Sequence, residues 1–143
     1  MVNHPIFLLD SDILIAMLRD RSDKTGLRSK ALSVGLENCY VSAISVAELY
    51  SGAYRMQSSN GLQEVSFIKT IFNIIPFGES ETDECESFGQ DKAILSKSGN
   101  VLDDMDLMIG TTAKSHKMIM VSHNVRHFSR IPGLVVQDWL EGA

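Results

Sequence analysis

The sequence predicts an α/β fold with three layers, in which helices cover both faces of a mainly parallel central sheet. Short, uninterrupted apolar runs, such as 6–9 and 118–121, alternate with longer segments whose apolar residues repeat at helical spacing. Such runs are typical of strands buried on both faces, and strands that alternate with helices form parallel sheets. Because no linker or repeat interrupts the pattern, residues 1–143 are expected to form a single domain.

In the first half of the chain, the apolar pattern predicts two strands and four helices. The strands lie at 6–9 and 39–41, and the helices have their apolar positions within 13–18, 27–36, 46–54 and 65–72. Asp12 is the expected cap of the first helix, and either Ser42 or Ser45 is the expected cap of the third. Residues 58–61 have the composition of a turn.

The second half of the chain continues the alternation with three short strands and two helices. The strands are expected at 73–77, 118–121 and 134–136, and the helices at 79–98 and from Asp103 or Asp104 to 113. The helix at 79–98 begins with acidic residues and ends with lysines, which matches the preference of the helix dipole. The segment between 121 and 134 is expected to be a loop.

Composition excludes several classes of protein. Hydrophobic residues make up 44% of the chain and charged residues 22%, which is ordinary for a folded domain and unlike a disordered one. No apolar run approaches the roughly 18 residues that span a bilayer, and the N-terminus lacks a signal-peptide pattern. With Cys39 and Cys85 as the only cysteines, no disulfide framework is expected, and a cytoplasmic location fits best.

Acidic residues stand beside strongly apolar sequence at widely separated positions. Asp10 ends the first predicted strand, and Glu48 lies about one helical turn beyond the second. Asp103, Asp104 and Asp106 open a predicted helix. An unpaired carboxylate is costly beside apolar surface, and ligands of parallel sheets bind at the carboxyl ends of the strands. We therefore expect these acids to meet around a hard divalent cation that acts on a phosphate ester.

Other polar residues of this edge could support such a site. Asn124 follows the predicted strand at 118–121, and the hydroxyl of Ser11 or Ser122 could orient a ligand or bind a phosphate oxygen. His123 and His127 are four residues apart, a spacing found in zinc sites. Because no cysteine is near and the segment is expected to be a loop, we interpret both histidines as solvated.

The charge of the chain bears on its substrate. A net charge of −5 differs from the basic surface that most nucleic-acid-binding proteins present, although bound metal would neutralise several of the candidate acids. Basic residues gather in the segments 19–30 and 114–130. Each segment is either a surface that holds phosphates or an ordinary solvated helix face.

Three segments of the chain together resemble the PIN-domain ribonucleases, specifically the VapC-type toxins of toxin–antitoxin pairs. They read FLLDSDILIAMLR, VSAISVAELYSGAY and DDMDLMIGTTAKSHKMIMVSHNVRHFSRIPGLVVQDW, and they occur in the family's order between residues 6 and 139. The resemblance implies a parallel sheet between helices and RNA cleavage that depends on Mg²⁺ or Mn²⁺. It also implies a cognate antitoxin as protein partner and a homodimer.

The resemblance carries site residues over by position. Asp10, Glu48 and Asp106 match the three acids of the family's site. Asn124 stands where many PIN domains have a fourth aspartate, and Asp104 matches an acid that is often found just before the third.

The chain departs from the family pattern at three positions near these acids. Asp12 and His123 stand where asparagine is frequent, and Ser122 replaces a usual threonine while keeping its hydroxyl. None of these departures removes the three-acid core, so ribonuclease activity is expected to be retained.

Two other functions stay open at this stage. Residues 8–12 also resemble the aspartyl nucleophile loop of haloacid-dehalogenase-type phosphatases, but Leu14 stands where that pattern has Thr or Val, and the chain is short for that fold. A PIN-like module that binds RNA or a protein without cutting is consistent with Asn124 in place of a fourth aspartate and with the net negative charge of the chain.

Overall fold

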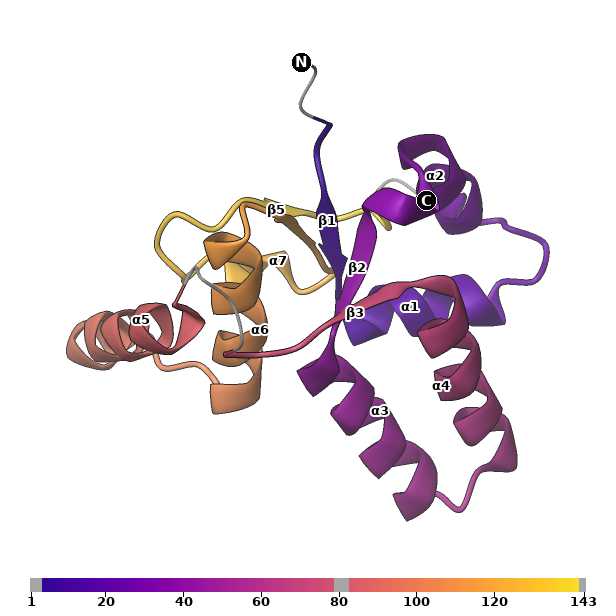
Figure 1. Ribbon diagram of the computed structural model, residues 1–143, viewed down its shortest axis with the longest axis horizontal. Helices are drawn as coiled ribbons and strands as arrows, with labels where there is room; N and C mark the ends of the chain where they lie inside the picture. Colours follow the sequence, from indigo (N-terminus) through magenta and orange to yellow (C-terminus); the bar gives the residue numbers. More distant parts are fainter. Residues whose placement is uncertain (1–3, 79–82, 142–143) are drawn as a thin grey trace.

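A five-stranded parallel sheet with helices on both faces forms the centre of the molecule (Figure 1). The computed structural model describes residues 4–78 and 83–141. The strand order is β3-β2-β1-β4-β5, and every neighbouring pair is parallel. The strands are β1 (Phe7–Leu9), β2 (Cys39–Ser42), β3 (Asn73–Ile75), β4 (Ile119–Val121) and β5 (Val136–Gln137). The α/β class and the parallel sheet predicted from the sequence are thus confirmed.

The helices form two groups on opposite faces of the sheet. They are α1 (Ser11–Arg19), α2 (Leu27–Val34), α3 (Ala43–Arg55), α4 (Ser59–Ile71), α5 (Glu84–Ser98), α6 (Asp104–Ser115) and the short α7 (Val125–Phe128). A 3₁₀ turn, η1 (Leu36–Asn38), precedes β2. Helices α1 to α4 contribute to one buried apolar cluster, and α5, α6 and α7 contribute to another. Within the described ranges, the helices are too short or too polar to span a bilayer.

The central strand β1 shows why its apolar run is continuous. Phe7 and Leu9 belong to the cluster beneath α1 to α4, whereas Leu8 belongs to the cluster beneath α6 and α7. Successive side chains of a strand point to opposite faces, so a strand covered on both faces needs an apolar residue at every position. Trp139 meets Phe7 edge to face at 5.3 Å, and Phe128 is fully buried, so both aromatic residues close the core.

Helix starts differ from the sequence predictions at two places. Asp10, and not Asp12, caps α1, because its carboxylate accepts a hydrogen bond from the backbone N–H of Ser11 at 2.9 Å. Residues 58–61 do not form a free turn: Ser58 caps α4 and accepts from the N–H of Gly61 at 2.9 Å. The prediction that Ser42 caps α3 is confirmed.

The second half of the chain holds two further differences from the sequence predictions. The structure describes α5 from Glu84 onward, so the predicted start of that helix at 79–82 lies outside the described residues. The segment between β4 and β5 is not only a loop but contains the helix α7. One apolar turn is too short to produce a helical repeat that sequence analysis would recognise.

Glycine at position 110 lets α6 lie close to the segment that follows α7. A Cβ added at Gly110 would collide with Cδ1 of Ile131 and lie 3.5 Å from Cδ1 of Phe128. Gly110 lies one helical turn after Asp106, on the same face of α6. The face of α6 that carries Asp106 is therefore the face that packs against α7.

Two lysine–aspartate pairs with very different exposure link α5 to α6. Lys114 Nζ lies 2.7 Å from Asp91 Oδ2 and 2.8 Å from the carbonyl oxygen of Pro132, and the Asp91 side chain is only 4% exposed. Lys92 Nζ lies 2.8 Å from Asp104 Oδ1, with side chains that are 49% and 57% exposed.

These two pairs predict unequal losses of stability. Lys114→Met leaves Asp91 buried without its partner, and we expect it to lower the free energy of unfolding by about 3 kcal/mol. The matched control Lys92→Met breaks a solvated pair and should cost less than about 1 kcal/mol. Urea unfolding at pH 7 measures both values. Equal losses in the two variants would contradict the assigned role of the buried pair.

Candidate active site

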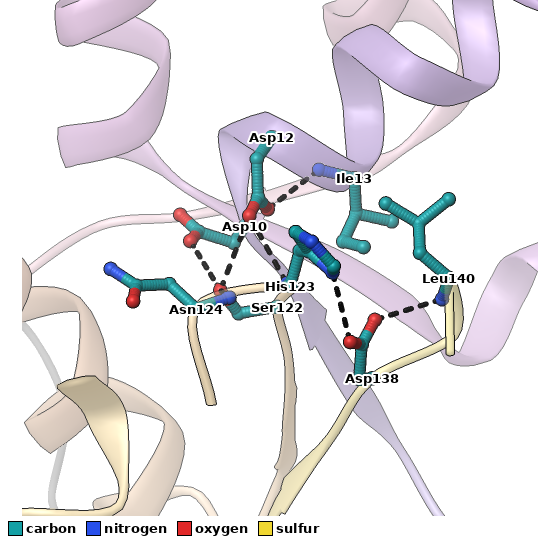
Figure 2. Close-up of polar contacts among 8 residues, drawn as sticks. All are labelled: Asp10, Asp12, Ile13, Ser122, His123, Asn124, Asp138 and Leu140. Atoms are coloured by element: carbon teal, nitrogen blue, oxygen red, sulfur yellow. Dashed lines mark hydrogen bonds and ion pairs between the residues drawn. The ribbon is translucent and has the colours of Figure 1, made fainter. Parts of the chain in front are cut away.

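Asp10 lies where β1 ends, beside the end of the neighbouring strand β4. Its backbone N–H donates to the carbonyl oxygen of Val121 at 2.9 Å, which continues the pairing of the two strands. The hydroxyl of Ser122 donates to Asp10 Oδ2 at 2.8 Å (Figure 2). The other oxygen, Oδ1, accepts from Ser11 N–H at 2.9 Å. Because adjacent parallel strands end at the same edge, residues 112 positions apart in the chain meet here.

A second aspartate ties the start of α1 to the segment after β4. Asp12 accepts from Ile13 N–H at 2.7 Å through Oδ1 and from His123 N–H at 3.1 Å through Oδ2 (Figure 2). His123 Nδ1 in turn lies 2.9 Å from Asp138 Oδ2. The prediction that His123 is a solvated loop histidine is therefore wrong in one respect: its ring is exposed but has a carboxylate partner.

The remaining candidate acids come from helices on opposite sides of the sheet. Glu48 lies on α3 and is half-buried. Asp106 lies in the first turn of α6, also half-buried, and its Oδ2 is 3.0 Å from Nε2 of His127 on α7. The prediction that His127 is a solvated loop histidine is wrong, because α7 turns this ring toward α6. Sequence reasoning missed this contact, since a single apolar turn around Phe128 was its only signal.

Partial burial and neighbouring negative charge raise the pKa of two of these carboxyl groups. Burial, and then the nearby Asp12 and Asp106 carboxylates, raise the pKa of Asp10 from 3.8 to about 7, although hydrogen bonds from Ser122 and Ser11 oppose the rise. Burial, and then Asp106 and Asp103, raise the pKa of Glu48. Asp106 thus acts electrostatically on both Asp10 and Glu48.

Two predicted site residues have other contacts in the structure. Asp104 forms an ion pair with Lys92 on α5, so the contact of its side chain is with α5 and not with the other acids. Asn124 stands at the start of α7, and its backbone N–H donates to Ser122 Oγ at 2.9 Å. Asp103, which sequence reasoning left as a capping residue or a ligand, caps α6 through Met105 N–H and also acts on Glu48.

The donor chemistry of this edge suits a hard cation. Within 4–78 and 83–141, no three His, Cys, Asp or Glu side chains converge tightly enough to hold an ion as they stand. Carboxylate oxygens are nevertheless the ligands that Mg²⁺ and Mn²⁺ favour. Partial burial, and then the Asp12 and Asp106 carboxylates, raise the pKa of Asp10, and a bound cation would offset the repulsion from those carboxylates. The donor chemistry of Asp10, Asp106 and Glu48 therefore suits such an ion, although their side chains would have to move closer together to hold it.

Comparison with known proteins gives the family of this fold. A family model described as the PIN domain matches residues 7–134. The chain belongs to the PIN-domain family. This PIN domain is 29% identical over 134 residues to ribonuclease VapC2 of Haemophilus influenzae, and the match covers 94% of this chain and 98% of that relative.

Solved structures agree with this assignment. A chain of VapBC-1 from nontypeable Haemophilus influenzae is 28% identical with a TM-score of 0.77, and a chain of VapBC2 from Rickettsia felis, bound to a DNA fragment from its promoter, has a TM-score of 0.80 at 21% identity. Each match covers 94% of this PIN domain and 98% of the other chain. The predicted PIN fold and the predicted resemblance to VapC-type ribonucleases are confirmed.

The pKa of Asp10 predicts how pH changes the stability of the metal-free protein. Because the folded value of about 7 exceeds the ordinary 3.8, the folded state keeps a proton that the unfolded chain releases. The free energy of unfolding should therefore fall as pH rises from about 4 to 7. Asp10→Asn removes this loss while it keeps a helix-capping side chain, so we expect it to be more stable than wild type at pH 8 in chelator, by on the order of 3 kcal/mol.

A matched aspartate-to-asparagine substitution at Asp20 should lower stability, whereas Asp10→Asn should raise it. Hydrogen bonds from Thr25 lower the pKa of Asp20, so Asp20→Asn should destabilise the protein at neutral pH. Thermal unfolding from pH 4 to 8 measures both variants. An Asp10→Asn variant with the same pH slope as wild type would contradict the assignment of the raised pKa.

Proposed function

We propose that this PIN domain is a metal-dependent endoribonuclease that cleaves RNA phosphodiester bonds, and that it is the toxin of a VapBC-type toxin–antitoxin pair. The observation that carries this proposal is the half-buried Asp10 carboxyl at the end of β1, whose pKa is raised to about 7 by partial burial and then by Asp12 and Asp106. Such a shift at the carboxyl edge of a parallel sheet is typical of a functional site. Similarity over nearly the whole length to a relative named ribonuclease VapC2 supports the reaction type.

In this proposal Asp10 and Asp106 are the principal ligands of Mg²⁺ or Mn²⁺, and Glu48 completes the set, partly through water. Ser122 holds Asp10 in place through its 2.8 Å hydrogen bond. Asp104 would have to leave Lys92 to join these ligands. When bound, the metal supplies an activated water and stabilises negative charge on the phosphate.

Residues around the acids would hold the RNA in position for this reaction. Asn124 offers an exposed amide next to Ser122, and Ser11 lies beside Asp10 at the start of α1. Arg126 is exposed on α7 and could bind a phosphate that flanks the cleaved bond. These basic and amide groups would offset the repulsion between RNA and the acidic edge.

Of the two alternative functions considered from the sequence, one is excluded and the other can be tested. The phosphatase interpretation of residues 8–12 is wrong, because the chain belongs to the PIN-domain family. The cleavage experiment described next distinguishes a nuclease from a PIN-like module that binds RNA without cutting it.

Removing a proposed ligand should abolish RNA cleavage. Asp10→Asn and Asp106→Asn are each expected to reduce the rate by about 100-fold or more, and excess chelator should do the same to wild type. The control Glu86→Gln removes an exposed carboxylate of α5 and should leave the rate unchanged. The assay uses structured and unstructured RNAs with Mn²⁺. RNA that binds wild type in Mn²⁺ without being cut would indicate the binding module instead.

A groove on the α1–α4 side suits the proposed antitoxin. It has a volume of about 270 Å³ and is lined mainly by apolar side chains, among them Leu32, Phe67 and Ile71, which are 67%, 51% and 37% exposed. Arg28 lines this groove and also an adjacent polar depression that contains Arg19. We expect the antitoxin to present an apolar segment that carries acidic residues. Similarity to chains of solved VapBC structures supports an antitoxin partner, and a homodimer is also part of the proposal.

A charge placed in the groove should separate toxicity from neutralisation. We expect wild-type expression to stop growth, and co-expression of the small protein encoded beside it to restore growth. Leu32→Asp should remain toxic but no longer be rescued, because it buries an unpaired carboxylate in the complex. Colony counts with and without the neighbouring gene measure this effect. Full rescue of Leu32→Asp would place the antitoxin elsewhere.

A further inference from the structure

The short helix α7 is joined by hydrogen bonds to two of the proposed metal ligands. Near its start, Ser122 Oγ donates to Asp10 Oδ2 at 2.8 Å and accepts from Asn124 N–H at 2.9 Å. Near its end, His127 Nε2 lies 3.0 Å from Asp106 Oδ2. A continuous set of contacts therefore runs from Asp10 through α7 to Asp106.

Close packing holds α7 in this place. Phe128 and Ile131 are each 1% exposed, and both face Gly110 on α6. Gly110 lies one turn beyond Asp106, so Gly110 and the Asp106 carboxylate lie on the same face of α6. Because α6 and the α7 segment approach closely along this face, the ring of His127 meets Asp106.

The direction of the hydrogen bond follows from the chemistry of its partners. A carboxylate that binds a cation only accepts hydrogen bonds, so in the proposed metal site Nε2 of His127 would donate the proton to Oδ2. The other oxygen, Oδ1, has no side-chain hydrogen-bond partner within 4–78 and 83–141, so it could face a cation. The bond also opposes the repulsion from Asp10 and Glu48, which would otherwise favour rotation of the Asp106 side chain away from them.

We propose that His127 is a positioning residue, which donates from Nε2 to Asp106 and holds this carboxylate where it can bind the same ion as Asp10. The inference rests on the proposed nuclease function. Groups that orient metal ligands commonly change metal affinity by 10–100-fold when they are removed. In this arrangement α7 links the spacing of the two ligands to the packing of the core through Phe128.

Two substitutions at one position isolate the hydrogen bond. His127→Leu keeps a side chain of moderate size but loses the donor, whereas His127→Gln keeps an N–H donor of similar reach. We expect His127→Leu to weaken Mn²⁺ binding by about 10–100-fold and to lower kcat, with the KM for RNA unchanged. His127→Gln should recover most of both losses. Ser129→Ala, an exposed position just after α7, is the matched control and should behave as wild type.

Mn²⁺ affinity is measured by the electron paramagnetic resonance signal of the free ion, kcat and KM by RNA cleavage, and folding by thermal unfolding in chelator. Wild-type Mn²⁺ affinity in His127→Leu would overturn the proposal, as would equal weakening in His127→Leu and His127→Gln. A change in KM alone would also overturn it, because His127 would then contact RNA. If His127→Leu fails to fold, wild-type-like affinity in the folded His127→Gln supports the proposal and weakened affinity overturns it.

A separate arm tests the function on which this inference rests. Asp106→Asn should lose both Mn²⁺ affinity and cleavage. If Asp106→Asn matches wild type in both, the proposed site itself is wrong. If Asp106→Asn is inactive while His127→Leu matches wild type, only the role of His127 is wrong.

Discussion

Repulsion between carboxylates at one edge of the sheet is the constraint on which the candidate site depends. Asp10 is partly removed from water and lies near Asp12 and Asp106, and the same Asp106 acts on Glu48. Like charges in such a place disfavour one another and raise pKa values. The fold therefore has to hold side chains together that would separate if they were free, and a hard cation is the ligand that would reverse this repulsion.

The layered architecture meets this constraint by delivering the acids from different elements. Asp10 comes from the end of β1. Glu48 comes from α3, which packs into the apolar cluster on one face of the sheet, and Asp106 comes from α6, which packs into the cluster on the other face. Each helix is anchored by its own buried apolar residues. The carboxylates thus come near enough to act on one another electrostatically because they are carried by separate, anchored elements, and local contacts such as Ser122 to Asp10 orient them.

Substantial parts of this arrangement could be predicted because they are local in sequence. Continuous apolar runs indicated the buried strands, and the Ser42 cap indicated the start of α3. The predictions failed where a signal was short or ambiguous. Residues 58–61 have the composition of a turn, but Ser58 caps α4. Helix α7 spans only residues 125–128, which is too short for a helical repeat of apolar residues. The histidine at position 127 was for that reason assigned to solvent.

The sequence by itself determined the class of the fold, and it identified the candidate acids and the sheet edge at which a site is expected. These follow from apolar periodicity and from the rule that parallel strands end on the same side. Only the tertiary structure decided which acids act on one another: Asp106 faces His127 and influences Asp10, whereas Asp104 pairs with Lys92. The physical reason is that residues two apart at a helix start point in different directions, and their partners come from elements distant in the chain.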